Sequence, residues 1–297
     1  MNVIDQALLD ITSLKIQGAT NVALKVLTTL EALIQQTPDI STTSLQDIGK
    51  QLANARPNEP LAQNAIRYIF SNPTNNILAK IQEFRTLIET GEELIPENGK
   101  QFILENGTYL TLCHSSTTVA LFQKAHETDT KFRLFVSETR PRFQGRITAK
   151  EVLEIGLSDV TMVIDSVAIS LLENKTEHID AVFIGADLLT DTGFVNKVGS
   201  LAVAAAGNRN NIPVYSLSTL LKFDPRSFDP TMIEKRSVQE IWEEAPEKLK
   251  FFSPAFDFVP YFPNVRIICE EGIIKGENVK DAVQKHFPFV LEIKNPA

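Results

Sequence analysis

The apolar positions in the first hundred residues repeat at helical spacing. Residues 76–91 carry apolar side chains every three or four positions, and Gly91 is the expected end of that helix because glycine favours the position after a helix. ARPNEP, at 55–60, predicts a rigid turn before another helical stretch over 61–70. A further buried helical stripe within 21–35 consists of Val22, Val26, Leu27, Leu30, Leu33 and Ile34.

From about residue 101 the period changes. Strand-like runs rich in β-branched and aromatic residues alternate with helical stretches, which predicts a mostly parallel sheet covered on both faces. These runs are 108–112, 131–136, 160–164, 181–184, 212–217 and 265–268. The fold class predicted is therefore α/β, with a helical N-terminal domain (1–100) followed by a Rossmann-like domain (101–297).

Polar side chains follow these strands where each one ends. The first strand leads into Cys113 and a serine-rich turn, and the fourth leads into Gly185-Ala186-Asp187. In open parallel sheets ligands bind beyond the carboxyl ends of the strands, so these groups are expected to converge there. A single Asp after a strand is about as often a helix cap, but several polar strand ends together favour a site.

Charge and motifs narrow the class of ligand. A net charge of −8 argues against nucleic acid or an anionic membrane surface as the main partner, while a local group of Lys and Arg still permits a small phosphorylated ligand. GxGxxG, GxxxxGK[ST] and GxSxG are absent, so we expect no nucleotide cofactor and no serine hydrolase. A thiol, carboxylates and cationic or amide groups remain, and these suit acid–base chemistry on an anion.

Metal, disulfide and membrane functions are not indicated. The two cysteines, Cys113 and Cys269, are far apart and form no CxxC pair, and the four histidines are scattered. We therefore expect no metal site and no disulfide framework. No apolar run is long enough to span a bilayer, and the first residues do not have the pattern of a signal peptide. We expect a cytoplasmic protein.

Four blocks resemble a known superfamily in the order in which that family carries them. They are CHSSTTVALFQKA, SETRPRFQGRITAKEV, IGADLLTDTGFVNKVGS and LSTLLKFDP. The superfamily unites ribose-1,5-bisphosphate isomerases, methylthioribose-1-phosphate isomerases and the α, β and δ subunits of initiation factor 2B. The resemblance covers nearly the whole chain. It implies a helical domain followed by a Rossmann-like domain, and a homo-oligomer (a dimer or a trimer of dimers).

The resemblance also implies roles for particular residues. Cys113 corresponds to the catalytic thiol, acting as a thiolate base, and Asp187 to the catalytic carboxyl, acting as an acid. A free cysteine is more often simple packing, but a position just before a helix start favours a thiolate. The residues that match substrate contacts are Gln17, Gly18, Ala19, Thr20, Arg56, Gln144, Asn196, Lys197 and Lys222.

Three functions follow as alternatives. Since the initiation-factor subunits generally lack the Cys and Asp pair, the resemblance favours a sugar-phosphate isomerase that converts ribose 1,5-bisphosphate to ribulose 1,5-bisphosphate. A methylthioribose-1-phosphate isomerase is the second, and a non-catalytic subunit sensing a sugar phosphate or nucleotide is the third. Gln17 stands where the family usually has an arginine on a phosphate. Glutamine brings no charge, so either Lys15 or another cation compensates, the substrate differs, or activity is weakened.

Overall fold

A seven-stranded sheet forms the centre of the larger part of the molecule. The computed structural model describes residues 2–71, 76–174, 177–226 and 228–292. The strand order is β10-β9-β7-β4-β1-β2-β3, and every neighbouring pair is parallel except β9 and β10. Bounds are β1 Gly107–Thr111, β2 Phe132–Ser137, β3 Val160–Val163, β4 Ala181–Gly185, β7 Val214–Leu217, β9 Val265–Cys269 and β10 Gly272–Lys275. The predicted strands and fold class are confirmed.

The strand order reverses between β1 and β4. From β1 the chain builds outward through β2 and β3, then returns to the other side of β1 and builds outward through β4, β7 and β9. In a doubly wound sheet such a reversal separates the connections on the two sides and leaves a crevice at the carboxyl ends of the two strands. The loops after β1 and β4 therefore border the expected ligand position.

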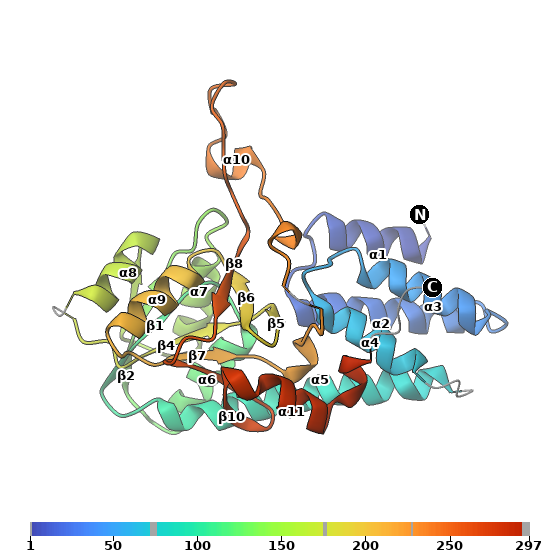
Figure 1. The fold of residues 1–297 in the computed structure, drawn as a ribbon, viewed down its shortest axis with the longest axis horizontal. Helices are drawn as coiled ribbons and strands as arrows, with labels where there is room; N and C mark the ends of the chain where they lie inside the picture. The colour runs from blue at the N-terminus through green and yellow to red at the C-terminus, as the bar shows by residue number, and fades with distance from the viewer. Residues whose placement is uncertain (1, 72–75, 175–176, 227, 293–297) are drawn as a thin grey trace.

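Helices cover both faces of this sheet (Figure 1). Neighbouring strand residues point to opposite faces, so Tyr109 packs in one apolar cluster and Leu110 in another. The helices α6 (Ser116–His126) and α7 (Gly145–Ile155) belong to the Tyr109 face, together with η1 (Lys100–Phe102). The helices α8 (Asp165–Glu173) and α9 (Ser200–Arg209) lie on the Leu110 face.

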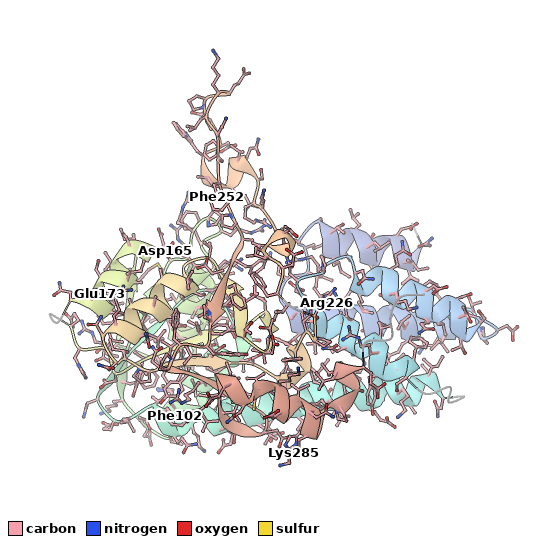
Figure 2. The ribbon with its side chains drawn as sticks, in the orientation of Figure 1. Phe102, Asp165, Glu173, Arg226, Phe252 and Lys285 are labelled. Atoms are coloured by element: carbon pink, nitrogen blue, oxygen red, sulfur yellow. The ribbon has the colours of Figure 1, made fainter. Side chains whose placement is uncertain are left out.

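A small antiparallel sheet and a projecting arm were not predicted. The sheet consists of β5 (Leu188–Leu189), β6 (Gly193–Lys197) and β8 (Phe256–Pro260). Before β8 come η2 (Leu220–Lys222), η3 (Pro230–Met232) and an arm, residues 233–254, that holds α10 (Val238–Ile241) and extends away from the body (Figure 1). Phe252 lies on this arm (Figure 2), and 84% of its surface is exposed.

The N-terminal helices pack beside the sheet. They are α1 (Val3–Thr12), α2 (Ala19–Gln36), α3 (Thr42–Ala53), α4 (Pro60–Phe70) and α5 (Ile77–Gly99). The expectation that Gly91 ends its helix is wrong. Gly91 is buried within α5 and does not have the positive φ of a helix-ending glycine, because the apolar stripe continues through Ile95 and packs on the sheet. None of the described helices combines the length and apolar character of a membrane span.

The last described element of the chain packs against the N-terminal helix α4. After η4 (Gly276–Asn278), the helix α11 (Val279–His286) and η5 (Pro288–Leu291) run back toward α4 (Figure 1). The Phe289 ring lies edge-on to Tyr68, with centroids 5.0 Å apart. One apolar cluster includes Val22 of α2 and Ile184 of β4. The division into domains at residue 100 stays a prediction.

Candidate active site

One cavity of about 380 Å³ lies at the point where the strand order reverses. Its floor comes from the ends of β1 and β4, and its walls come from the start of α2, the loop before α4, β6 and the base of the arm. The cavity brings together every residue that the sequence predicts for the site: Gln17, Gly18, Ala19, Thr20, Arg56, Cys113, Gln144, Asp187, Asn196, Lys197 and Lys222.

Two threonines hold the backbone of Cys113 in position. Its N–H donates to Thr139 Oγ1 at 2.8 Å, and its carbonyl accepts from Thr148 Oγ1 at 2.9 Å. Cys113 has a φ of 70°, a left-handed conformation that a residue with a side chain rarely adopts. Such a conformation persists only where neighbouring groups hold it, and these two bonds do so. The thiol is thereby fixed at the end of β1.

Burial controls the protonation of this thiol. It raises the pKa of Cys113 to about 11, and the nearby Lys197 ammonium opposes the rise. The backbone N–H of His114, just before α6, lowers the pKa of the thiol as expected, but burial outweighs it. Near neutral pH the thiol of the free protein is therefore mostly protonated.

Asp187 faces the cavity from the loop after β4. Its N–H donates to the Val195 carbonyl at 2.8 Å, which ties this loop to β6. The Lys222 ammonium donates to the neighbouring Ala186 carbonyl at 2.8 Å. Burial lowers the pKa of Lys222, and the Asp187 and Glu59 carboxylates oppose that change. A carboxyl and an ammonium thus lie at the same strand end.

Asn196 and Lys197 come from the end of β6 and are buried. The Asn196 amide donates to Ser200 Oγ at 2.9 Å. The Lys197 ammonium lies over the Phe256 ring, 4.4 Å from its centroid, and a cation in this position is attracted to the ring face. Phe256 on β8 therefore sets the direction from which Lys197 enters the cavity.

The start of α2 presents backbone donors to the cavity. Gly18 precedes the helix with a φ of 86°, and no side chain caps the first turn at Ala19 and Thr20. Uncapped N–H groups at a helix start bind anions. Gln17 is exposed at the rim, and its side-chain amide donates to the Leu14 carbonyl at 3.0 Å. The proposed substitute Lys15 pairs with Asp10 at 3.1 Å.

The sequence interpretation missed several cavity residues. Arg56 Nη2 pairs with Glu59 at 3.0 Å and with Glu234 at 3.4 Å, and both carboxylates line the cavity. Glu59 is the residue just before α4, which begins at Pro60. Arg142 and Arg236 also line the cavity. No pattern in the sequence distinguishes them from surface arginines.

A metal centre finds no support in the part of the chain that the structure describes. No three His, Cys, Asp or Glu side chains are grouped there as metal ligands would be. The cavity lining offers a thiol, carboxyls, ammonium and guanidinium groups, and backbone donors.

A family model described as "Initiation factor 2 subunit family" matches residues 15–276. This protein belongs to the initiation factor 2 subunit family. Among curated family members, the ribose 1,5-bisphosphate isomerase of Archaeoglobus fulgidus is 30% identical over 280 residues, which cover 90% of this chain and 88% of that protein. The methylthioribose-1-phosphate isomerase of Thermotoga maritima is 33% identical over 279 residues, covering 83% and 80%. The family resemblance read from the sequence is confirmed.

Solved structures of the family share the fold. A translation initiation factor eIF-2B from Pyrococcus horikoshii OT3 has a TM-score of 0.79 at 23% identity, covering 92% of this chain and 96% of that one. The 5-methylthioribose 1-phosphate isomerase from the same organism has a TM-score of 0.73 at 22% identity, covering 95% and 87%. Because this fold is common to isomerases and initiation factors, function has to be argued from the site.

Proposed function

We propose that this member of the initiation factor 2 subunit family isomerises an aldose 1-phosphate to the 2-ketose, with ribose 1,5-bisphosphate as substrate and ribulose 1,5-bisphosphate as product. The observation that carries the proposal is the meeting of Cys113 and Asp187 in one cavity at the ends of adjacent strands. The names of the curated relatives support sugar-phosphate isomerisation. Lys197, Lys222 and the uncapped N–H groups at the start of α2 can bind the phosphate of such a substrate.

The chemistry requires at least two groups, one that donates a proton and one that accepts a proton. A phosphate on C1 prevents the ring from opening as a free sugar does, so the ring oxygen must be protonated as its bond to C1 breaks. Asp187 donates this proton. Cys113, as thiolate, removes the C2 proton and later returns it to C1. Each positioned transfer contributes roughly a hundredfold to ten-thousandfold in rate. The Lys197 ammonium stabilises negative charge that develops on the intermediate.

Activity assays test this proposal directly. The protein is offered ribose 1,5-bisphosphate and methylthioribose 1-phosphate in parallel, and ketose formation is measured. Cys113→Ser and Asp187→Asn should each reduce kcat by about a hundredfold or more with an unchanged circular dichroism spectrum. Cys269→Ala removes the other thiol, which lies on β9, and should keep activity. Full activity in either of the first two variants rejects the assignment.

One observation favours methylthioribose 1-phosphate as the alternative substrate. Gln17 contributes no charge and turns its amide toward Leu14, which suits a ligand with one phosphate rather than two. A regulatory subunit that senses sugar phosphates or nucleotides is the third possibility. It predicts that these ligands raise the melting temperature while neither isomerase substrate turns over.

Assembly as a homo-oligomer, a dimer or a trimer of dimers, belongs to the same proposal. A related structure is a tetrameric eIF2B-beta2-delta2 complex from C. thermophilum. The arm of this chain exposes Trp242, Leu249 and Phe252, and a projecting apolar surface favours association.

A further inference from the structure

Glu59 has a buried carboxylate oxygen with no bond to the protein. Its side chain is only 2% exposed. One oxygen, Oε1, pairs with Arg56 Nη2 at 3.0 Å, whereas the buried Oε2 has no hydrogen-bond partner among the described residues. Although Glu59 precedes α4, its side chain does not cap that helix. The carboxylate therefore has no structural role that accounts for its second oxygen.

Arg56 offers a matching donor beside it. Its Nη1 is also buried and without a partner among the described residues, while its Nη2 is held by Glu59 and Glu234. A buried polar atom left unpaired destabilises the folded protein, and a charged group does so more strongly. Since both residues line the cavity, a ligand that brings one acceptor and one neighbouring donor satisfies both atoms. A phosphate oxygen next to a hydroxyl has this arrangement.

The proposed isomerisation contains a proton that Cys113 and Asp187 do not account for. Conversion of an aldose 1-phosphate to the 2-ketose removes hydrogen from C2 and from the C2 hydroxyl, and adds hydrogen to C1 and to the ring oxygen. Cys113 carries the C2 proton to C1, and Asp187 donates a proton to the ring oxygen. The proton of the C2 hydroxyl still needs an acceptor, and this hydroxyl is the one next to the phosphate-bearing carbon.

We propose that Glu59 binds the C2 hydroxyl of the substrate and accepts its proton as C2 becomes a carbonyl. This inference rests on the proposed function. In the first step Asp187 protonates the ring oxygen, which keeps the electron pair of its broken bond to C1. Cys113 removes the C2 proton, and the C2–H pair forms the C1=C2 bond of an enol.

In the second step Glu59 takes the hydroxyl proton, and the O–H pair forms the C2 carbonyl. The C1=C2 pair then takes the proton back from Cys113, which completes the ketose. Cys113 ends as thiolate, Asp187 as carboxylate and Glu59 as carboxylic acid. Transfer of one proton from Glu59 to Asp187, whose charge acts on Glu59 across the cavity, restores the starting state.

The environment of Glu59 suits a base. Burial raises its pKa to about 7; Asp187 and Glu234 add to the rise, and Arg56 and Lys222 oppose it. A base whose pKa lies near the working pH is ionised before the step and still holds a proton after it.

Kinetics of Glu59 variants separate binding from proton transfer. Glu59→Gln keeps an acceptor oxygen but cannot take a proton, so kcat should fall about a hundredfold or more while KM stays within roughly threefold. Glu59→Ala should lose both the acceptor oxygen and the group that takes the proton. Added formate should restore part of its kcat. Glu92→Gln is the matched control, because Glu92 is exposed on α5, within electrostatic reach of Lys222 and outside the cavity lining. Wild-type kcat in Glu59→Gln overturns the proposal.

Binding of two probes to proteins that carry Cys113→Ser, which lack the proposed base, tests the hydroxyl contact without turnover. Calorimetry compares ribose 1-phosphate with 2-deoxyribose 1-phosphate, and the protein with Cys113→Ser alone should prefer the ribose compound by about tenfold, which adding Glu59→Ala reduces to roughly threefold or less. Equal preference in both proteins overturns the hydroxyl contact. A wild type that isomerises neither substrate defeats the proposed function and the proton transfer, whereas an active wild type with an unaffected Glu59→Gln defeats only the role of Glu59.

Discussion

At the scale of single residues, burial raises the pKa values of two groups that the proposed chemistry uses. The pKa of Cys113 rises to about 11 and that of Glu59 to about 7, both because charge is disfavoured away from water. Glu59 is ionised in much of the protein slightly above neutral pH, whereas the Cys113 thiolate is rare there. A mechanism that uses this thiolate is limited by how little of it exists.

This scarcity predicts how the reactivity of Cys113 depends on pH. A thiol is uncharged below its pKa, so its thiolate fraction grows tenfold for each pH unit until the pH reaches the pKa. In a Cys269→Ala protein, the rate at which iodoacetamide alkylates Cys113 should therefore rise close to tenfold per unit between about pH 7.5 and about pH 9.5. Alkylation rates across this range measure the slope. A plateau that begins below about pH 9 would show that burial does not raise the pKa of this thiol.

At the scale of elements, α5 joins the two parts of the fold. Its first turns pack among the N-terminal helices, and its later turns, after Gly91, pack against the sheet and α6. A Cβ added at Gly91 would meet Thr219 at 3.6 Å, an ordinary contact distance. At Gly99, on the same helix, it would lie 2.9 Å from Leu121 Cδ1, which is too close.

Gly91→Ala should therefore stabilise the protein. Alanine is favoured over glycine in a helix interior by about 1 kcal/mol, and no backbone rearrangement is needed here. The free energy of unfolding, measured with urea, should rise by about 0.5–1 kcal/mol. Gly99→Ala is the comparison and should give no such gain, because the Leu121 side chain has to move. A marked loss of stability in Gly91→Ala would mean that the helix does end at this glycine.

At the scale of the whole molecule, buried polar contacts tie the helical region to the sheet region. The Asn64 amide on α4 donates to the carbonyls of Leu221 at 2.6 Å and Phe223 at 2.9 Å. Lys222 lies between those two residues and reaches the cavity. The same contact thus supports both stability and the position of a candidate ligand group.

Asn64→Ala should weaken both properties. Removing the amide leaves two buried carbonyls without that donor, at roughly 1–3 kcal/mol each, so unfolding free energy should fall by about 3 kcal/mol. KM for the sugar phosphate should also rise, because η2 is released. Urea unfolding and initial rates measure the two effects. Asn54→Ala, at an exposed position on the end of α3, should change stability by no more than about 0.5 kcal/mol. Equal stability of both variants would argue against a structural role for the Asn64 contact.

The amino-acid sequence by itself determined every strand of the central sheet except β10, and the chemistry at the ends of the parallel strands. The change from a helical to a strand-and-helix pattern at about residue 101 is local, and so are Cys113 and Asp187 after their strands. Parallel strands in a doubly wound sheet share one carboxyl edge, so order along the chain was enough to predict that these two residues meet.

Only the tertiary structure decided the parts that depend on distant neighbours. The strand β5 forms because β6 pairs with it. It has only two residues, which is too short for an alternating hydrophobic pattern to be recognised in the sequence. The helix α5 continues past Gly91 because the sheet covers its apolar stripe. Glu59 lies in the turn before α4, and its burial near Glu234 and Lys222 arises from packing between segments far apart in the chain. Burial and electrostatic environment at such positions depend on residues from several distant segments, so no local sequence pattern predicts them.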